Sequence, residues 1–185
     1  MQVANQLVDI SSGSVTTYPL TAMGSFVFAI SPDERHMITM ETCDGPQPDS
    51  RVYIYDRSVD ETRLLKDCDG RYAYSFDWLA DSRHVLMAIT DNASESPNRA
   101  IVLKDVETGD ETPLTDGIEF SAGAIPSPDR QLVLVTGDSL HLYDSSGLLL
   151  QQVEPPTGFS VIAAAWSPDG QRFAYLIGPT GVWGI

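Results

Sequence analysis

The chain has 185 residues, and its formal net charge is -15 because 26 Asp and Glu residues outnumber 11 Lys and Arg residues. This length and a hydrophobic content of 42% suffice for one domain or two small ones with a core, which excludes a disordered chain. The acidity argues against nucleic acid or an anionic membrane as a partner, and every apolar stretch is far shorter than the roughly 20 residues of a membrane-spanning helix.

The chain begins with a predicted hairpin over residues 1–20, in which a strand ends at Asp9 and a Ser-Ser-Gly turn follows. The same unit, a strand, an Asp, a small polar turn and a second strand, returns three times along the chain. An Asp followed by a polar or Gly-containing turn is typical of a strand connection. The Asp residues that mark the unit are 47, 49 and 39 residues apart: Asp9, Asp56, Asp105 and Asp144.

A second unit alternates with the first and consists of an apolar strand, a turn of the Ser-Pro-Asp type and another strand. Two independent markers therefore keep one register, and a period of this length is typical of a four-stranded propeller blade. The turns of the second unit, at positions 31, 80, 127 and 167, are 49, 47 and 40 residues apart.

The alternation predicts an all-β chain, a single β-propeller domain over residues 1–185 with about four four-stranded antiparallel blades. We name the strands of a blade A to D from the inside outward. The chain then opens with a C-D pair and closes with an A-B pair, the permuted order by which many propellers complete the last blade with N-terminal strands. The predicted divisions are a C-D hairpin at 1–20, blades at about 25–67, 72–116 and 120–155, and a final A-B hairpin at 160–178.

Three closures of the ring are compatible with this length. The chain forms a small four-bladed ring, half of an eight-bladed ring made with a second copy, or a segment of a longer propeller. We expect self-association, such as a homodimer, or a longer propeller in preference to the four-bladed monomer. Residues 182–185 read as the start of another C strand, which would compete with the N-terminal pair for the last blade.

The turn motifs carry a resemblance to the TolB-type, WD-repeat-like (PD-repeat) β-propeller family over essentially the whole chain. The best copy is Trp-Ser-Pro-Asp-Gly-Gln-Arg-Phe-Ala-Tyr at residues 166–175. Other copies depart from it, since Glu34 replaces the Gly, residues 79–82 lack the Pro and residues 126–129 lack the aromatic residue. The resemblance implies a fold and not one function, because the repeat occurs in periplasmic protein-binding propellers, sensor ectodomains and substrate-gating propellers of prolyl-oligopeptidase-like enzymes.

The family is commonly extracytoplasmic, so the resemblance favours a periplasmic or secreted location, although the first ten residues lack the basic start and apolar segment of an export signal. The turn Asp residues are predicted to be structural. Pro suits the second position of a type I turn, Asp caps the local backbone, and Gly accepts the positive φ that follows. The Asp residues with this role are Asp33, Asp81, Asp129 and Asp169.

Catalytic motifs are missing from the sequence. It has no Gly-x-Ser-x-Gly elbow, no His-Glu-x-x-His and no phosphate-binding loop, so we expect neither catalysis nor a cofactor. His36 and His84 occupy the same repeat position, which favours one repeated structural role over a metal site, and His141 lies in another blade. No metal is expected.

Cys43 follows a B strand and Cys68 follows the next D strand, so both are predicted on the face that carries the B-C and D-A connections, here called the loop face. Two alternatives remain open for them, a disulfide within one blade or two separate buried thiols. The sequon Asn92-Ala93-Ser94 lies in the longest polar loop and matters only in an exporting, glycosylating host.

The loop face also collects long acidic loops, and we expect it to bind a partner because rigid scaffolds present binding residues on loops. The expected function is non-catalytic binding of a protein or peptide. The alternative is the substrate-gating propeller portion of a larger peptidase or hydrolase whose catalytic domain lies outside this chain. A cation held by the four Asp residues of this face is disfavoured because no spacing resembles a calcium loop. The candidate residues are Asp44, Asp49, Asp67, Asp69, Arg71, Tyr72 and Tyr74.

Overall fold

The computed structural model of the chain describes residues 4–19, 26–46, 48–91, 98–115 and 123–180. Every regular element in these residues is a β-strand, and none of them forms a helix long and apolar enough to cross a membrane. The Asn92 sequon, residues 116–120 of the predicted loop face and the strand expected at residues 182–185 lie outside the described ranges.

The strands form three four-stranded sheets and two two-stranded hairpins among the described residues, and all neighbours pair antiparallel. The N-terminal hairpin is β1 (Ala4–Val8) with β2 (Val15–Pro19), and the C-terminal hairpin is β15 (Phe159–Trp166) with β16 (Phe173–Pro179). Blade 1 contains β3 (Phe26–Ile30), β4 (His36–Thr42), β5 (Ser50–Asp56) and β6 (Glu61–Lys66). Blade 2 contains β7 (Arg71–Trp78), β8 (His84–Asp91), β9 (Asn98–Asp105) and β10 (Glu111–Pro113), and blade 3 contains β11 (Gly123–Pro126), β12 (Leu132–Thr136), β13 (Leu140–Asp144) and β14 (Leu149–Val153).

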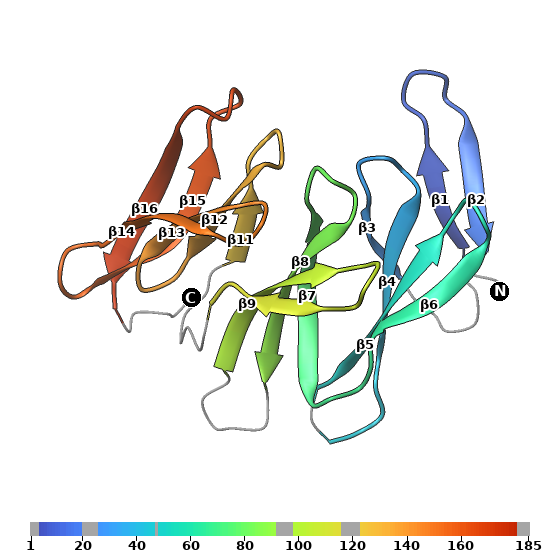
Figure 1. Cartoon of the computed structure of the whole chain (residues 1–185), viewed down its shortest axis with the longest axis horizontal. Helices are drawn as coiled ribbons and strands as arrows, with labels where there is room; N and C mark the ends of the chain where they lie inside the picture. The colour runs from blue at the N-terminus through green and yellow to red at the C-terminus, as the bar shows by residue number, and fades with distance from the viewer. Residues whose placement is uncertain (1–3, 20–25, 47, 92–97, 116–122, 181–185) are drawn as a thin grey trace.

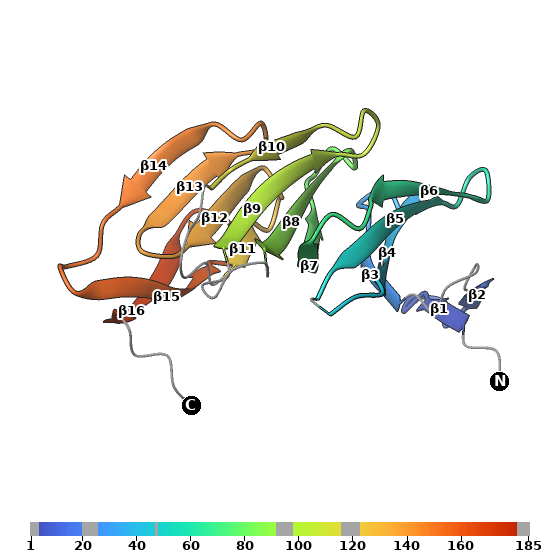
Figure 2. The same ribbon diagram turned by 90° about the horizontal axis from the view of Figure 1, so that it is seen from below.

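The sheets stand side by side in an open arc (Figures 1 and 2). The all-β, bladed fold predicted from the repeats is confirmed, but the ring closed on itself by one chain is not the arrangement found. The two hairpins lie at opposite ends of the arc and belong to separate sheets. The sheets between them do not turn far enough to bring β16 beside β1.

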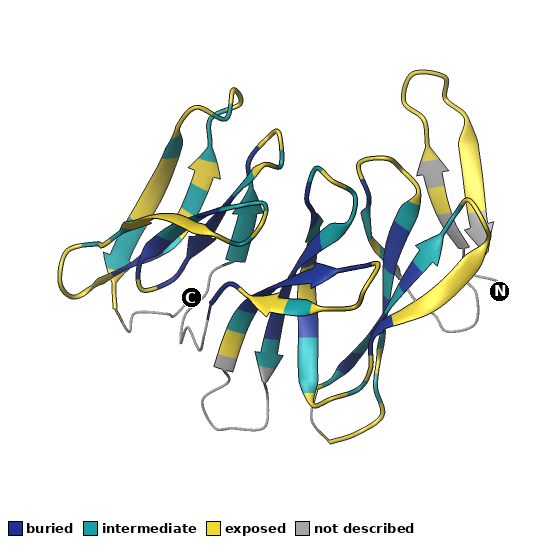
Figure 3. Ribbon diagram, in the orientation of Figure 1, coloured by how far each residue is buried: buried dark blue, intermediate teal, exposed yellow. Residues whose placement is uncertain are grey.

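Apolar side chains fill the spaces between successive sheets, and Figure 3 shows the buried residues concentrated in the middle strands of the blades. One cluster joins blades 1 and 2 around Trp78, a second joins blades 2 and 3 around Leu79, and a third joins blade 3 to the C-terminal hairpin around Val161. Blades 2 and 3 therefore bury both of their faces against neighbouring sheets, which is the physical reason for their apolar strands.

The A-B turns repeat one backbone geometry. In each, the first residue accepts a hydrogen bond from the backbone N–H three positions on, at Ser31, Leu79, Ser127 and Ser167. The sequence-based alignment at position 80 is therefore wrong by one residue, because Leu79 replaces the Ser, and the true steps are 48, 48 and 40 residues. The capping Asp residues fall in register and accept bonds from backbone N–H groups two positions on: Asp33, Asp81, Asp129 and Asp169.

The residue after each capping Asp has positive φ, and this predicts a stabilising substitution. Glu34, Arg130 and Gly170 have φ of 59°, 58° and 67°. Because a left-handed conformation costs an L-residue about 1–2 kcal/mol, partly offset by the chain entropy of glycine, Glu34→Gly is expected to stabilise the chain by about 0.5 kcal/mol. The bond from Arg57 Nη1 survives because it ends on the backbone oxygen of Glu34.

Urea unfolding measures this effect, with Gly170→Ala as the matched opposite change. Only ordinary contact with Pro128, at 3.6 Å, meets a Cβ added at Gly170, so its expected loss of about 1 kcal/mol reports backbone strain alone. A lower urea midpoint for Glu34→Gly would contradict the proposed strain.

In blades 1 and 2, side-chain hydrogen bonds join the C-D turn to the A-B turn of the same blade. Arg35 donates to Asp56 at 2.7 Å and Arg83 donates to Asp105 at 2.5 Å, and these bonds hold the pKa of both carboxyl groups far below the usual value. His36 Nε2 and His84 Nε2 lie 3.6 and 3.9 Å from the same two carboxylates. The two histidines thus play the single repeated role expected from their register.

Candidate functional site

A disulfide joins two connections of blade 1 at the loop face. Cys43 lies just after β4 and Cys68 just after β6, and their Cα atoms are 6.1 Å apart. Of the two alternatives that the sequence left open, the structure contains the bridge. It fastens the loop after β4 to the loop before β7, two segments that start from different strands.

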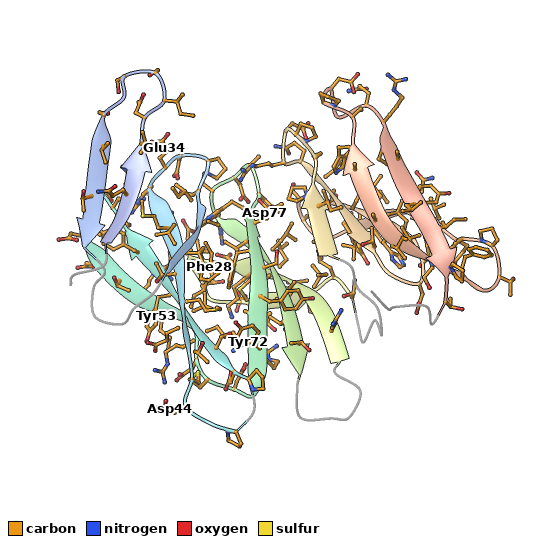
Figure 4. The ribbon with its side chains drawn as sticks, turned by 180° about the vertical axis from the view of Figure 1, so that it is seen from behind. Phe28, Glu34, Asp44, Tyr53, Tyr72 and Asp77 are labelled. Atoms are coloured by element: carbon orange, nitrogen blue, oxygen red, sulfur yellow. A yellow bond between two sulfur atoms is a disulfide. The ribbon has the colours of Figure 1, made fainter. Side chains whose placement is uncertain are left out.

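A hollow of about 630 Å³ lies beside this disulfide. Its wall includes Tyr72 from β7 and Thr90 from β8, together with the loop after β4, whose proline rings present apolar surface. The hydroxyl of Thr90 is buried and has no hydrogen-bond partner among the described residues. Figure 4 shows Tyr72 and Asp44 toward the same end of the molecule, away from Glu34 in the A-B turn. The full lining is Thr42, Cys43, Gly45, Pro46, Pro48, Tyr72 and Thr90.

A buried lysine occupies the base of the same loops. The Lys66 side chain is only 2% exposed, and its ammonium group lies 2.8 Å from Asp69 and 3.4 Å from Asp49. It also donates to the backbone oxygens of Ser50 and Asp67, at 2.7 and 3.0 Å. Asp49 is further held by the N–H of Gly70 at 2.9 Å. Asp49 and Asp69 are therefore counterions of a lysine, and that ammonium group opposes the binding of a cation between them.

Two arginines pair with further carboxylates in and beside these loops. Arg51 bridges Glu41 and Asp67 at 2.9 and 2.8 Å, and its hydrogen bond, together with that from the N–H of Cys68, lowers the pKa of Asp67. Arg71 bridges Asp69 and Glu111 at 2.7 and 2.8 Å.

Burial acts to raise the pKa of Asp69, but the bonds from Arg71 and Lys66 hold it below the usual value. Glu111 in turn lies 3.6 Å from Lys104, which extends the network to β9.

The seven predicted binding residues thus fall into different environments. Asp49, Asp67, Asp69 and Arg71 have ion-pair partners within the chain, whereas Tyr72 lines the hollow and Asp44 is exposed beside it. Tyr74 lies at a β-bulge of β7 and is 39% exposed, and burial raises the pKa of its hydroxyl. It is not part of the hollow.

The sequence analysis did not single out the rest of the hollow. The sequence feature that could have indicated this hollow is the Gly-Pro-x-Pro run at residues 45–48, because it stiffens the loop and gives it an apolar surface. Among the described residues, one group has the proximity that a metal site requires, namely Cys43, Cys68 and Asp49, with ligand atoms within 4.8 Å of one another. While the disulfide is intact, this group offers no thiolate, and its carboxylate already accepts bonds from Lys66 and Gly70.

Comparison with known proteins gives a likeness of fold. No family model and no curated protein sequence matches the chain. Among solved structures, TolB from Acinetobacter baumannii superposes with a TM-score of 0.58 at 20% identity, over 96% of this chain and 44% of that one. The β-propeller domain of the Trilobed protease from Pyrococcus furiosus superposes with a TM-score of 0.59 at 14% identity, over 84% of this chain and 49% of that one. The fold is a TolB-like β-propeller.

Other proteins with this TolB-like propeller fold are enzymes. Oligogalacturonate lyase from Vibrio parahaemolyticus matches with a TM-score of 0.61 at 16% identity, over 96% of this chain and 53% of that one. An acylaminoacyl peptidase from Pyrococcus horikoshii matches over 85% of this chain and 28% of that one. The TolB-like propeller described here spans about half the length of several solved relatives, in keeping with an open arc.

Proposed function

We propose that this propeller binds a protein or peptide segment without catalysing a reaction, and that the hollow beside Tyr72 receives it. The observation that carries the proposal is the lining of this hollow, in which Tyr72 and two prolines present apolar surface beside the disulfide. Tyrosines in such positions anchor interfaces.

The charges around the hollow give it a rigid frame. The ion pairs of Lys66, Arg51 and Arg71 and the disulfide hold the surrounding loops, so little conformational entropy is lost when a partner binds. These ion pairs also neutralise most of the local carboxylates. Recognition is therefore proposed to depend on apolar contact with Tyr72 and the prolines more than on the net charge of the chain.

Panning a displayed library of random linear peptides against the protein tests this role. We expect Thr42→Arg, which places a long cationic side chain in the hollow, to weaken the selected peptides at least tenfold. Thr42 is exposed at the end of β4, so folding is expected to survive. Tyr72→Ala should weaken the same peptides, and its urea midpoint shows how much of the loss is structural.

Gln171→Arg is the matched control, because it adds the same charge at an exposed turn of the C-terminal hairpin. Peptides that bind all three variants as tightly as the unmodified protein would place recognition away from the hollow. Peptides lost with Gln171→Arg alone would contradict the proposal equally.

The second candidate is the substrate-gating portion of a larger hydrolase. It is favoured by the match to part of an acylaminoacyl peptidase and to the propeller domain of a protease. A gene that continues in the same reading frame into a Gly-x-Ser-x-Gly domain supports this candidate over the first.

A further inference from the structure

The two ends of the arc carry complementary half-blades. The N-terminal hairpin has the place and turn chemistry of C and D strands, whereas the C-terminal hairpin has those of A and B strands. Within the described residues, β16 pairs only with β15 and β1 pairs only with β2, so each strand has one edge without a partner strand. Among the described residues, each hairpin is therefore one half of a four-stranded blade, and the two halves are complementary.

The C-terminal hairpin packs against blade 3, and the N-terminal hairpin lies beside blade 1. Trp166 Nε1 donates to the oxygen of Ile125 at 3.0 Å and the N–H of Val161 donates to Gly137 at 2.8 Å, which fixes the C-terminal hairpin against blade 3. At the other end, a hollow of about 190 Å³ lies between the β1–β2 turn and blade 1, with Asp9 and Glu34 on opposite sides. The C-terminal half-blade is thus held in position, and within the described residues both hairpins have an open edge.

These free edges have the composition of paired strands. Neither β1 (ANQLV) nor β16 (FAYLIGP) has a charged residue, although exposed edges are normally protected by charges. The outer edge strand β6 (ETRLLK) has that protection, whereas the outer edge strand β14 (LLQQV) also has no charged residue. Large apolar side chains are also exposed on both edges, Val8 at 54%, Tyr175 at 43% and Leu176 at 58%.

We propose that two copies of this chain close one ring, with β16 of each copy pairing antiparallel with β1 of the other. The blades themselves set the register. In blades 1, 2 and 3 the first residue of the B strand lies opposite the Asp of the C-D turn, as in His36↔Asp56 and His84↔Asp105. The equivalent residue of the C-terminal hairpin is Arg172, whose backbone oxygen accepts a bond from the N–H of Ser167.

This register places Arg172 opposite Asp9 of the second copy and Tyr175 opposite Gln6 of the second copy. An arginine then stands where blades 1 and 2 have His36 and His84 and blade 3 has Leu132, so a charge pair forms across each of the two junctions. The propeller domain of the Trilobed protease, of which this chain matches 49%, shows that one propeller uses about twice the aligned length. Two head-to-tail junctions close such a ring, whereas an angle that does not close gives a filament.

Oxidative cross-linking tests both the partner and the register. For the variant Gln6→Cys/Tyr175→Cys we expect a covalent dimer after mild oxidation, seen by denaturing electrophoresis without reductant. Thr17→Cys/Tyr175→Cys is the matched control, because Thr17 lies opposite Gln6 on β2, one strand farther out. It should stay monomeric in the same gel.

Light scattering of the unmodified protein should give twice the 20.2 kDa of one chain. A monomer at all concentrations would overturn the proposal, as would a ladder of higher oligomers or equal cross-linking of the two cysteine variants. These outcomes do not depend on the hollow beside Tyr72, so failure here leaves the peptide-binding test unaffected.

Discussion

Lys66→Met is expected to lower the free energy of unfolding by about 3 kcal/mol, because removing one partner of a buried ion pair leaves the other charges without compensation. Asp49 and Asp69 share the Lys66 ammonium group, and the backbone oxygens of Ser50 and Asp67 lose a donor. Asp69 is partly exposed, which keeps the effect at the lower end of the range for buried pairs. Urea unfolding followed by tryptophan fluorescence measures it.

Arg35→Met is the control for this prediction. Arg35 forms an equally short ion pair with Asp56, but its side chain is 52% exposed and screened by solvent, so its loss should cost much less than the loss of Lys66. Equal effects of the two substitutions would show that Lys66 is no more important than a surface cation. A double-mutant cycle with Asp69→Asn then measures the coupling between Lys66 and its nearest carboxylate.

Cys43→Ser/Cys68→Ser is expected to destabilise the chain by about 3 kcal/mol, since the bridge closes a loop with a sequence separation of 25 residues. In the unmodified protein, a reducing agent should lower the free energy of unfolding by the same amount, which is seen as a lower urea midpoint. The double variant should not respond to the reducing agent, which makes it the control. An unchanged midpoint after reduction would mean that the ion pairs alone hold these loops.

The blades were predictable because their signal is local and repeated. The Ser-Pro-Asp turns and the Asp residues of the C-D turns each depend on hydrogen bonds within a few residues, such as Ser127 Oγ to Asp129 at 2.6 Å. Where the turn sequence departs from Ser-Pro-Asp, the predicted position of the turn was less accurate. At Leu79 the Ser is missing, and Asp81 instead accepts bonds from His84, including one from the ring at 2.5 Å, so the turn was placed one residue late.

The candidate site was predicted less well because its chemistry depends on distances between loops. The sequence placed Asp49 and Asp69 among the residues expected to bind a protein or peptide, but both converge on one buried lysine whose position no local pattern indicates. The place of Cys43 beside Cys68 was deduced from topology, whereas the formation of the bridge was not. The curvature of the arc also depends on packing between sheets, so sequence spacing could not choose among the closures.

Lys66 and Lys104 are the only lysines of the chain, and both are buried. Among the described residues, every exposed cationic side chain other than a protonated histidine is therefore an arginine. Reagents that acylate lysine amines will find these two side chains shielded in the folded protein and reach them when the blades separate. Amine labelling at Lys66 and Lys104 thus reports the opening of the propeller, with no engineered probe.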